Sequence, residues 1–481
     1  MHIGQSVQLR ARETVTPFNH LNFNPMPPSP FIPLASGNKG LSGLPRLLPW
    51  PKRLDVSLLC FLGLFVATCD RANISVAAPS MMKEYGWDIT TMGWVLSTFY
   101  VGYMGFMIPA GVLADRFGPK RIFALAMASW SSFTALTSLP RSLGVLGIVR
   151  TFMGIGESAT IPSINAILAR WFPPEEYSRT AGFTWSGGYG GIILAFPLAS
   201  LILKFLGWRM IFYLFATLGG LWLIFWLKAI YDQPEDCPTI SRAEMELIRS
   251  SRPQIKGDEP IPWSVILHTP EAWAVFALHF SSNWFTYFLM SWLPTYLVIG
   301  RHFSLRQMAL GSALPFLCAL CGTNLFGYLI DRVSRSSSRT HVNKTFLLPF
   351  ACAAGILIVI SKVSSSSVVV PLLCISATLM TSATPVFASG SLDLVPGSAG
   401  SFVGVQNSIA NLSGVLAPVI TGYLATSTGW MAAFSCTAAV CAFGITCYWL
   451  MGKAERRPPS PRGPINFSSF EISSIGPEFV D

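Results

Sequence analysis

Stretches of mainly apolar residues recur along the chain, separated by short polar connections. A transmembrane helix needs roughly 20 apolar residues, and each stretch is long enough to cross a bilayer. Six of these stretches precede a longer polar segment, residues 231–270, and six follow it. The predicted spans are 56–80, 91–114, 120–139, 143–170, 180–204, 208–230, 271–299, 307–330, 342–362, 367–388, 400–425 and 430–452. The pattern therefore predicts an all-α, polytopic membrane protein with twelve transmembrane helices.

Two short motifs occur once in each set of six spans, at similar offsets. GVLADR at 111–116 follows the second span and GYLIDR at 327–332 follows the eighth, while Gly-Trp opens the sixth span at 207–208 and the twelfth at 429–430. Such internal echoes predict two pseudo-symmetric six-helix halves with a site between them. The predicted parts are an N-terminal tail 1–53, a first half 54–230, a linker 231–270, a second half 271–452 and a C-terminal tail 453–481, with both tails disordered.

Composition supports a membrane protein. Of 481 residues, 51% are hydrophobic and only 12% are charged, whereas soluble domains carry about 25% charged residues. The net charge of +10 is spread over loops and tails, as expected of charges that set topology, so we expect a lipid bilayer and no nucleic acid as partner. The Lys/Arg distribution predicts that both termini are cytosolic.

The N-terminal tail leaves the membrane of residence open. Glu13 is its only acidic residue, and the stretch is basic and rich in proline. It is read either as a disordered cytosolic tail or as a transit peptide to an organelle such as a plastid. The sequence thus leaves plasma membrane and organelle membrane as alternatives.

Charged residues inside two of the spans are the first functional signal. Asp70 and Arg71 lie near the middle of the first span, and Arg150 and Glu157 lie in the fourth. A charge inside the bilayer costs several kcal/mol, so such residues usually face a cavity or a partner. At 3.6 residues per turn, Arg150 and Glu157 share one face of their helix. Two structural alternatives remain: the charges lock the first span to the fourth, or Arg150 snorkels to the membrane surface.

The connection between the second and third spans has a distinctive form. Gly111, Asp115, Arg116, Gly118 and Arg121 belong to the run GVLADRFGPKR, in which a Gly-Pro pair breaks the helix. This run resembles the signature loop of the major facilitator superfamily. The resemblance implies a gating role, in which Asp115 pairs with helix ends in one conformation.

Further segments resemble one family within that superfamily, the anion:cation symporters. They are CDRANISVA at 69–77, RTFMGIGE at 150–157, ARWFPPE at 169–175, SWLPTYL at 291–297 and the stretch 407–418. Members of that family include bacterial proton-coupled sugar-acid importers, plastid phosphate carriers and animal organic-anion transporters.

The family resemblance assigns roles to the four intramembrane charges. It implies that Arg71 and Arg150 bind the substrate anion and that Asp70 and Glu157 couple transport to protons. The chemistry agrees, because the planar guanidinium fork fits a carboxylate or phosphate, and carboxyl groups in a low dielectric exchange protons more readily near neutral pH. Protonation of one acid would leave a net positive charge that attracts an anion.

Polar residues on otherwise apolar spans are further candidates for substrate binding. They are Tyr103, Asn283, Asn407 and Asn411, and His279 shares a helix face with Asn283. Hydrogen bonds between helices are the alternative explanation for each of them.

The sequence also bears on the class of function. Cys318 and Cys321 form a lone C-x-x-C inside an apolar span, and neither a nucleotide-binding fingerprint nor a zinc spacing occurs in a credible context. We therefore expect no enzyme, no metal and no cofactor other than a coupling ion, H+ or alternatively Na+.

The resulting hypothesis is a monomeric secondary active transporter. It would carry a small anionic solute, a sugar acid or another carboxylate, by proton symport and alternating access. The alternatives are a sodium-coupled phosphate carrier of an organelle membrane and, in a different class, an anion-sensing membrane receptor that does not transport.

Overall fold

The computed structural model describes residues 51–251, 268–334, 337–363, 365–394 and 399–453, and their regular structure is helical. The first group of helices is α1 (Lys52–Tyr85), α2 (Ile89–Phe117), α3 (Pro119–Leu136), α4 (Leu143–Glu157), α5 (Thr160–Trp171), α6 (Pro174–Leu206) and α7 (Trp208–Ala229). The second group is α10 (Pro270–Thr295), α11 (Leu305–Val333), α12 (Arg339–Lys362), α13 (Ser366–Met380), α14 (Thr384–Leu394), α15 (Ala399–Ser427) and α16 (Trp430–Met451). A short helix, α8 (Arg242–Ser251), follows the first group. The all-α fold class is confirmed.

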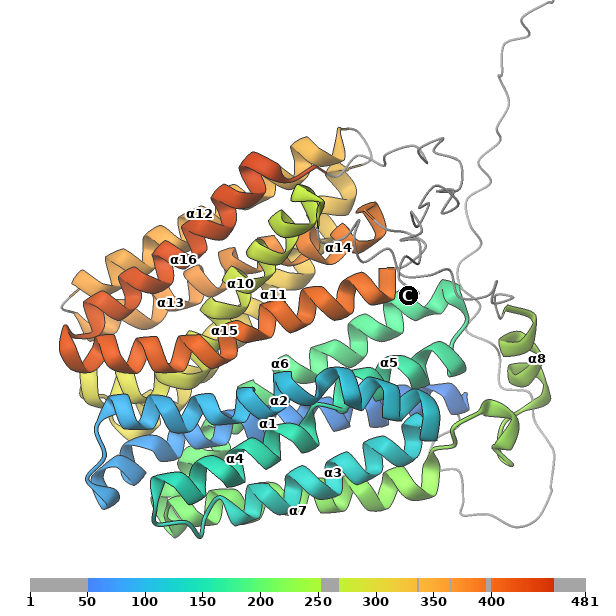
Figure 1. The fold of residues 1–481 in the computed structure, drawn as a ribbon, viewed down its shortest axis with the longest axis horizontal. Coiled ribbons are helices and arrows are strands. Elements are labelled where there is room, and N and C mark those ends of the chain that lie inside the picture. Colours follow the sequence, from blue (N-terminus) through green and yellow to red (C-terminus); the bar gives the residue numbers. More distant parts are fainter. Residues whose placement is uncertain (1–50, 252–267, 335–336, 364, 395–398, 454–481) are drawn as a thin grey trace, which may run out of the picture. The chain divides into compact units, whose positions relative to one another are not determined.

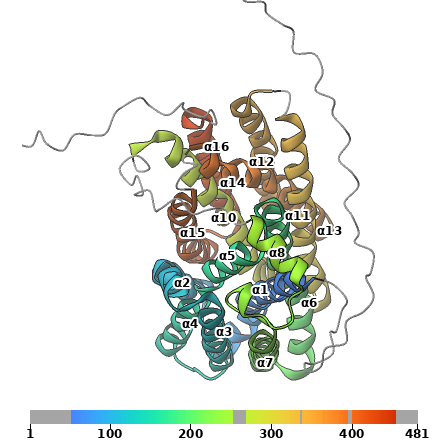
Figure 2. The same ribbon diagram turned by 90° about the vertical axis from the view of Figure 1, so that its right-hand side faces the viewer.

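The two groups of helices form two bundles that lie against each other. Seen along the helices, α1 to α7 form one bundle and α10 to α16 the other (Figure 2). The bundles contact each other through α2 with α15, α6 with α11 and α1 with α10. Helix α8 lies beyond the ends of the first bundle, on the side where α1 begins and α16 ends (Figure 1). We call this the terminus side.

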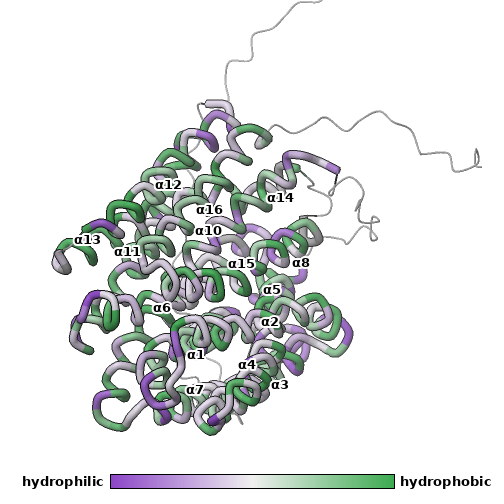
Figure 3. The backbone as a smooth tube through the Cα atoms, turned by 60° about the vertical axis from the view of Figure 1, so that its left-hand side comes forward, coloured by the Kyte–Doolittle hydropathy of each residue, from purple (hydrophilic) through white to green (hydrophobic). Residues whose placement is uncertain are grey.

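Many of the helices suit a bilayer. Within the described residues, eight helical segments are long and apolar enough to span a membrane, and they lie in α2, α6, α7, α11, α12, α13–α14, α15 and α16. Helices α1, α3, α4–α5 and α10 occupy the positions of the other four predicted spans. Hydrophobic colour predominates along the helices, and the strongly hydrophilic stretches lie mainly where helices end (Figure 3).

Two predicted spans are each divided into two helices. Span 143–170 breaks at Ser158 into α4 and α5, and span 367–388 breaks into α13 and α14 through a 3-10 turn, Thr381–Ala383. A proline lies just beyond each break, Pro162 in the first case and Pro385 in the second. Proline has no N–H to donate to the carbonyl four residues earlier. The carbonyl left without this bond belongs to Ser158 in the first case and to Thr381 in the second. Hydropathy alone does not detect such breaks.

The internal echo is visible in the geometry. Helices α2 and α11, which end in the paired motifs, are both 29 residues long, and α7 and α16 are both 22 residues long. Gly207 and Gly429 precede α7 and α16 with φ of 83° and 90°, a region that favours glycine. The same backbone turn therefore opens the last helix of each bundle.

The bundles are tightly packed on the side opposite the termini. A Cβ on Gly93 of α2 would lie 2.7 Å from the carbonyl oxygen of Pro418 in α15. Close by, the Ser97 hydroxyl donates to the carbonyl of Val415 at 2.8 Å. Nearer the terminus side, Ile108 of α2 is 68% exposed. The two halves thus close against each other at the end of α2 that carries Gly93 and Ser97.

Candidate functional site

Four charged side chains lie inside the first bundle. Asp70 and Arg71 come from the middle of α1, whereas Arg150 and Glu157 come from α4. Asp70 and Glu157 are 0% exposed and Arg150 is 1% exposed. The snorkelling interpretation of Arg150 is therefore wrong, because its guanidinium is enclosed by protein.

Arg71 and Glu157 form an ion pair between α1 and α4. The Arg71 Nε donates to Glu157 Oε1 at 3.1 Å, and its Nη2 contacts the same oxygen. The guanidinium also lies over two rings of α2, with its carbon 4.7 Å from the centroid of Tyr103 and 5.3 Å from that of Phe99. Cation–π contacts of this kind add to the stability of a desolvated guanidinium.

Arg150 has no matching carboxylate within the described residues. Its guanidinium carbon lies 5.3 Å from the centroid of Phe99, and Nη1 contacts the sulfur of Met153 at 3.0 Å. Its Nε has no hydrogen-bond partner in the described part of the chain. A buried donor without a partner is costly, so Arg150 is a candidate to receive an anion. Both arginines lie against the same Phe99 ring.

Asp70 faces a different neighbour from Arg71. Successive residues of a helix differ in direction by about 100°, so Asp70 points toward α3, where Trp130 Nε1 donates to its Oδ2 at 3.2 Å. The other carboxylate oxygen, Oδ1, has no partner among the described residues. Sequence reasoning missed Trp130, because a tryptophan in an apolar span carries no local sign of its partner.

A layer of aromatic and amide groups joins this cluster to the second bundle. Tyr100 of α2 packs against Tyr287 of α10 with ring centroids 4.6 Å apart, and a Cβ on Gly414 of α15 would lie 2.3 Å from the Tyr100 ring. The Tyr287 hydroxyl donates to Asn411 Oδ1 at 2.5 Å, and Asn411 Nδ2 donates to the carbonyl of Asn407 at 2.8 Å. Tyr100 and Tyr287 were not predicted; the spacing of Tyr100 three residues before Tyr103 was the available signal.

Asn283 remains separate from this arrangement. It is partly buried on α10, and no contact among the described residues joins its side chain to the four charged groups.

The loop motif also lies apart from the charged cluster. Gly118, with φ of +92°, makes the turn from α2 to α3 on the terminus side. Gly111 is partly buried in α2, whereas Asp115, Arg116 and Arg121 are exposed. The carboxylate at the start of α3 comes from Asp232, described below, and not from Asp115.

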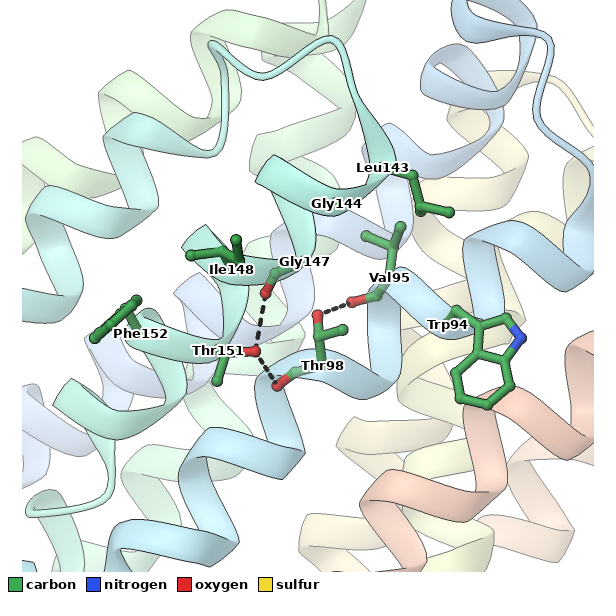
Figure 4. Close-up of a pocket in the computed structure, with 9 residues that line it drawn as sticks. All are labelled: Trp94, Val95, Thr98, Leu143, Gly144, Gly147, Ile148, Thr151 and Phe152. Carbon is green, nitrogen blue, oxygen red and sulfur yellow. Dashed lines mark hydrogen bonds between the residues drawn. The ribbon is translucent and has the colours of Figure 1, made fainter.

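A groove on the surface between α2 and α4 is unsuited to an anion. Its volume is about 490 Å³, and it is lined by Trp94, Val95, Thr98, Leu143, Gly144, Gly147, Ile148, Thr151 and Phe152 (Figure 4). Its hydroxyls bond to the backbone, since Thr151 donates to the carbonyls of Thr98 and Gly147. No charged residue lines it, so the charged cluster is the stronger candidate site.

The fold defines the class of protein: a polytopic membrane protein built from two helical bundles. A family model for the Major Facilitator Superfamily matches residues 60–418. The chain is 33% identical over 421 residues to an ascorbate transporter of the chloroplast from Arabidopsis thaliana, covering 85% of this chain and 77% of that protein. It is 33% identical over 423 residues to a chloroplastic sodium-dependent phosphate transport protein 1 of the same plant, covering 85% and 82%.

A solved structure shares the fold. The crystal structure of a bacterial homologue of the human lysosomal transporter Spinster, inward-facing and unoccupied, is similar with a TM-score of 0.70 and 17% identity, over 85% of this chain and 99% of that one. The chain belongs to the Major Facilitator Superfamily, whose members are transporters and not enzymes.

Proposed function

We propose that the protein is a proton-coupled symporter of a small organic anion, with Arg71 and Arg150 as anion ligands. The observation that carries this proposal is the burial of Arg150, which is 1% exposed and whose Nε has no hydrogen-bond partner in the described part of the chain. A guanidinium in this setting fits a carboxylate with two parallel hydrogen bonds. Arg71, on the same Phe99 ring, would supply the second cation.

Glu157 supports a coupling mechanism. Its carboxylate accepts a hydrogen bond from the Arg71 guanidinium. Glu157 therefore competes with a substrate anion for the N–H donors of Arg71. Protonation of Glu157 would release Arg71 and leave the group of Asp70, Arg71, Arg150 and Glu157 with a net charge of +1. An anion that then binds restores neutrality. The loaded carrier can therefore change conformation without moving net charge. In the empty carrier, the ion pair of Arg71 with Glu157 takes the place of the substrate anion.

Two relatives bear on the substrate. The similarity to an ascorbate transporter supports an organic acid, since ascorbate is a small monovalent anion at neutral pH. The similarity to a sodium-dependent phosphate transport protein favours the second candidate, a sodium-coupled phosphate carrier. Both relatives are chloroplastic, which supports an organelle membrane for this protein.

Reconstituted protein tests the proposal. Liposomes with an imposed pH gradient are screened for uptake of labelled sugar acids, ascorbate and phosphate, with and without sodium. We expect accumulation of an organic anion that follows the pH gradient and is lost in Arg150→Gln. Arg209→Gln is the matched control, because Arg209 pairs with Glu84 outside the cluster. Accumulation that requires sodium and ignores pH would replace the first candidate with the second, and binding without counterflow would favour a receptor.

A further inference from the structure

The segment after α7 contacts several helix ends of the first bundle. We call Tyr231–Ser251 the clamp segment; it includes a 3-10 turn, Pro234–Asp236, and α8. It lies on the terminus side, next to the start of α1 (Figures 1 and 2). The polar composition of this region predicted a linker, yet Glu244 of α8 is only 7% exposed. A buried carboxylate needs partners.

Glu244 finds these partners at the start of α1. Its two carboxylate oxygens accept from the backbone N–H groups of Lys52 at 3.0 Å and Arg53 at 2.9 Å. The first N–H groups of a helix have no partner within the helix, and the N-cap residue of α1, Pro51, provides no side-chain cap. A distant carboxylate therefore does what an N-cap side chain usually does.

The local sequence around Glu244 makes this contact more specific. Ser241 caps α8, and its hydroxyl accepts from the backbone N–H of Glu244 at 3.2 Å. In the motif Ser-x-x-Glu, the glutamate usually returns to the N–H of its own capping serine. Here the carboxylate of Glu244 reaches α1 instead, so α8 is tied to another helix.

Asp232 repeats the arrangement at α3. Its Oδ1 accepts from the backbone N–H of Lys120 at 2.8 Å, and the N-cap residue of α3, Gly118, has no side chain to cap with. A Cβ on Gly118 would lie 2.8 Å from Asp232 Oδ2, so the glycine of the loop motif makes room for this carboxylate. Negative charge at a helix N-terminus is also favoured by the helix dipole.

Arg53 extends the network to α6. Its Nη2 donates to Glu176, in the first turn of α6, at 3.1 Å, and its Nη1 lies 3.8 Å from Glu244. The clamp segment thus connects the starts of α1 and α3, and Arg53 of α1 extends this network to the start of α6. Because α1 carries Asp70 and Arg71, its position along the bundle sets where these groups meet α3 and α4.

We propose that the clamp segment positions α1 for transport, with Glu244 and Asp232 as positioning residues. This inference rests on the transport activity proposed above. Loss of the clamp would leave α1 folded and still bonded to α6 through Arg53 and Glu176, but its start would no longer be tied to α8 and, through the clamp segment, to α3. The first bundle would then no longer rock as one body.

The test separates positioning from simple helix capping. Glu244→Ala removes the clamp contact, and adding Pro51→Ser gives α1 a local cap in the extended backbone conformation that caps adopt. Hydrogen exchange is measured over 52–56 and over α8, and counterflow of the labelled anion is measured in liposomes. Glu246→Ala is the matched control, since Glu246 is exposed on the same helix.

We expect Glu244→Ala to lose hydrogen-exchange protection both at 52–56 and in α8. The double variant should regain protection at 52–56 but not in α8. The maximal counterflow rate falls about ten-fold in both variants, with the control unchanged. Full recovery of transport in the double variant would show that Glu244 acts only as a helix cap and would overturn the proposal. Unchanged hydrogen-exchange protection of α8 in Glu244→Ala would also overturn it. A wild-type protein without counterflow would instead refute the proposed transport function, while hydrogen exchange would still decide whether the clamp exists.

Discussion

The most direct test of the coupling mechanism is the substitution Glu157→Gln. Glutamine has nearly the volume of glutamate, and its amide oxygen can still accept from Arg71, which donates to Glu157 at 3.1 Å. The change removes the titratable group and the negative charge and leaves the packing of α1 against α4 intact. Effects on transport can therefore be assigned to the missing proton and not to a disturbed fold.

The expected size of the effect follows from the number of protons. One pH unit is worth about 1.4 kcal/mol per proton, so one proton carried with a monovalent anion across a gradient of ~2 units supports accumulation of about 100-fold. This symport moves no net charge, so the membrane potential adds nothing. If Glu157 carries the proton, Glu157→Gln moves the anion alone, and with the membrane potential held at zero the anion equilibrates to a ratio of about 1.

Counterflow provides the complementary measurement. Exchange of labelled for unlabelled anion needs no net proton movement, so Glu157→Gln should retain it, and affinity should rise because Arg71 has lost a competing carboxylate. Glu84→Gln serves as the control, since Glu84 accepts from Arg209 and Trp208 away from the cluster. Undiminished pH-driven accumulation in Glu157→Gln would refute the mechanism. Asp70→Asn then reports whether Asp70 carries a proton instead.

Two further predictions concern stability. A Cβ on Gly154 would lie 2.0 Å from the carbonyl oxygen of Phe99, so Gly154→Ala should push α4 away from α2. We expect the substitution to lower the free energy of unfolding by about 1–3 kcal/mol and to lower the melting temperature in detergent. Gly144 has open space around it, so Gly144→Ala should leave the melting temperature unchanged. Asp88 caps α2, and hydrogen bonds from Thr91 hold the pKa of its carboxyl below the ordinary value of 3.8. Asp88→Ala should cost about 1 kcal/mol at neutral pH. Its difference from wild type should start to shrink below pH 3.8 and be lost as the pH falls through the lowered pKa of Asp88, so a difference that is unchanged in strong acid would contradict the assignment.

The intramembrane charges were predictable because the free-energy cost of a charge in an apolar span can be read from the sequence of that span alone. A charged residue in an apolar span requires a partner whatever the fold, so Asp70, Arg71, Arg150 and Glu157 were identified from the sequence. Their choice of partner depends on contacts between helices far apart in the chain. For that reason, the sequence did not distinguish pairing of Arg71 with Glu157 from other pairings.

The divided spans and the clamp show a different limit. Hydropathy averages over many residues, so a single proline such as Pro162 leaves the span pattern unchanged while it breaks the helix. Charge patterning identified Glu244 as one of many polar residues of a connecting segment. Only the fold brings the start of α1, nearly 200 residues earlier in the chain, to its carboxylate.

The positions of the charges suggest how the two halves divide the work of transport. Asp70, Arg71, Arg150 and Glu157 all belong to the first bundle, whereas the groups named here from the second bundle, Tyr287 and Asn411, are neutral. Rocking the second bundle against the first would then open the site to either side without separating any ion pair, which would be costly in a low dielectric. This requires the first bundle to keep its shape during the cycle. A clamp that fixes the start of α1, about 27 Å from Arg71 along a helix rising 1.5 Å per residue, meets that requirement from the terminus side, far from the charges themselves.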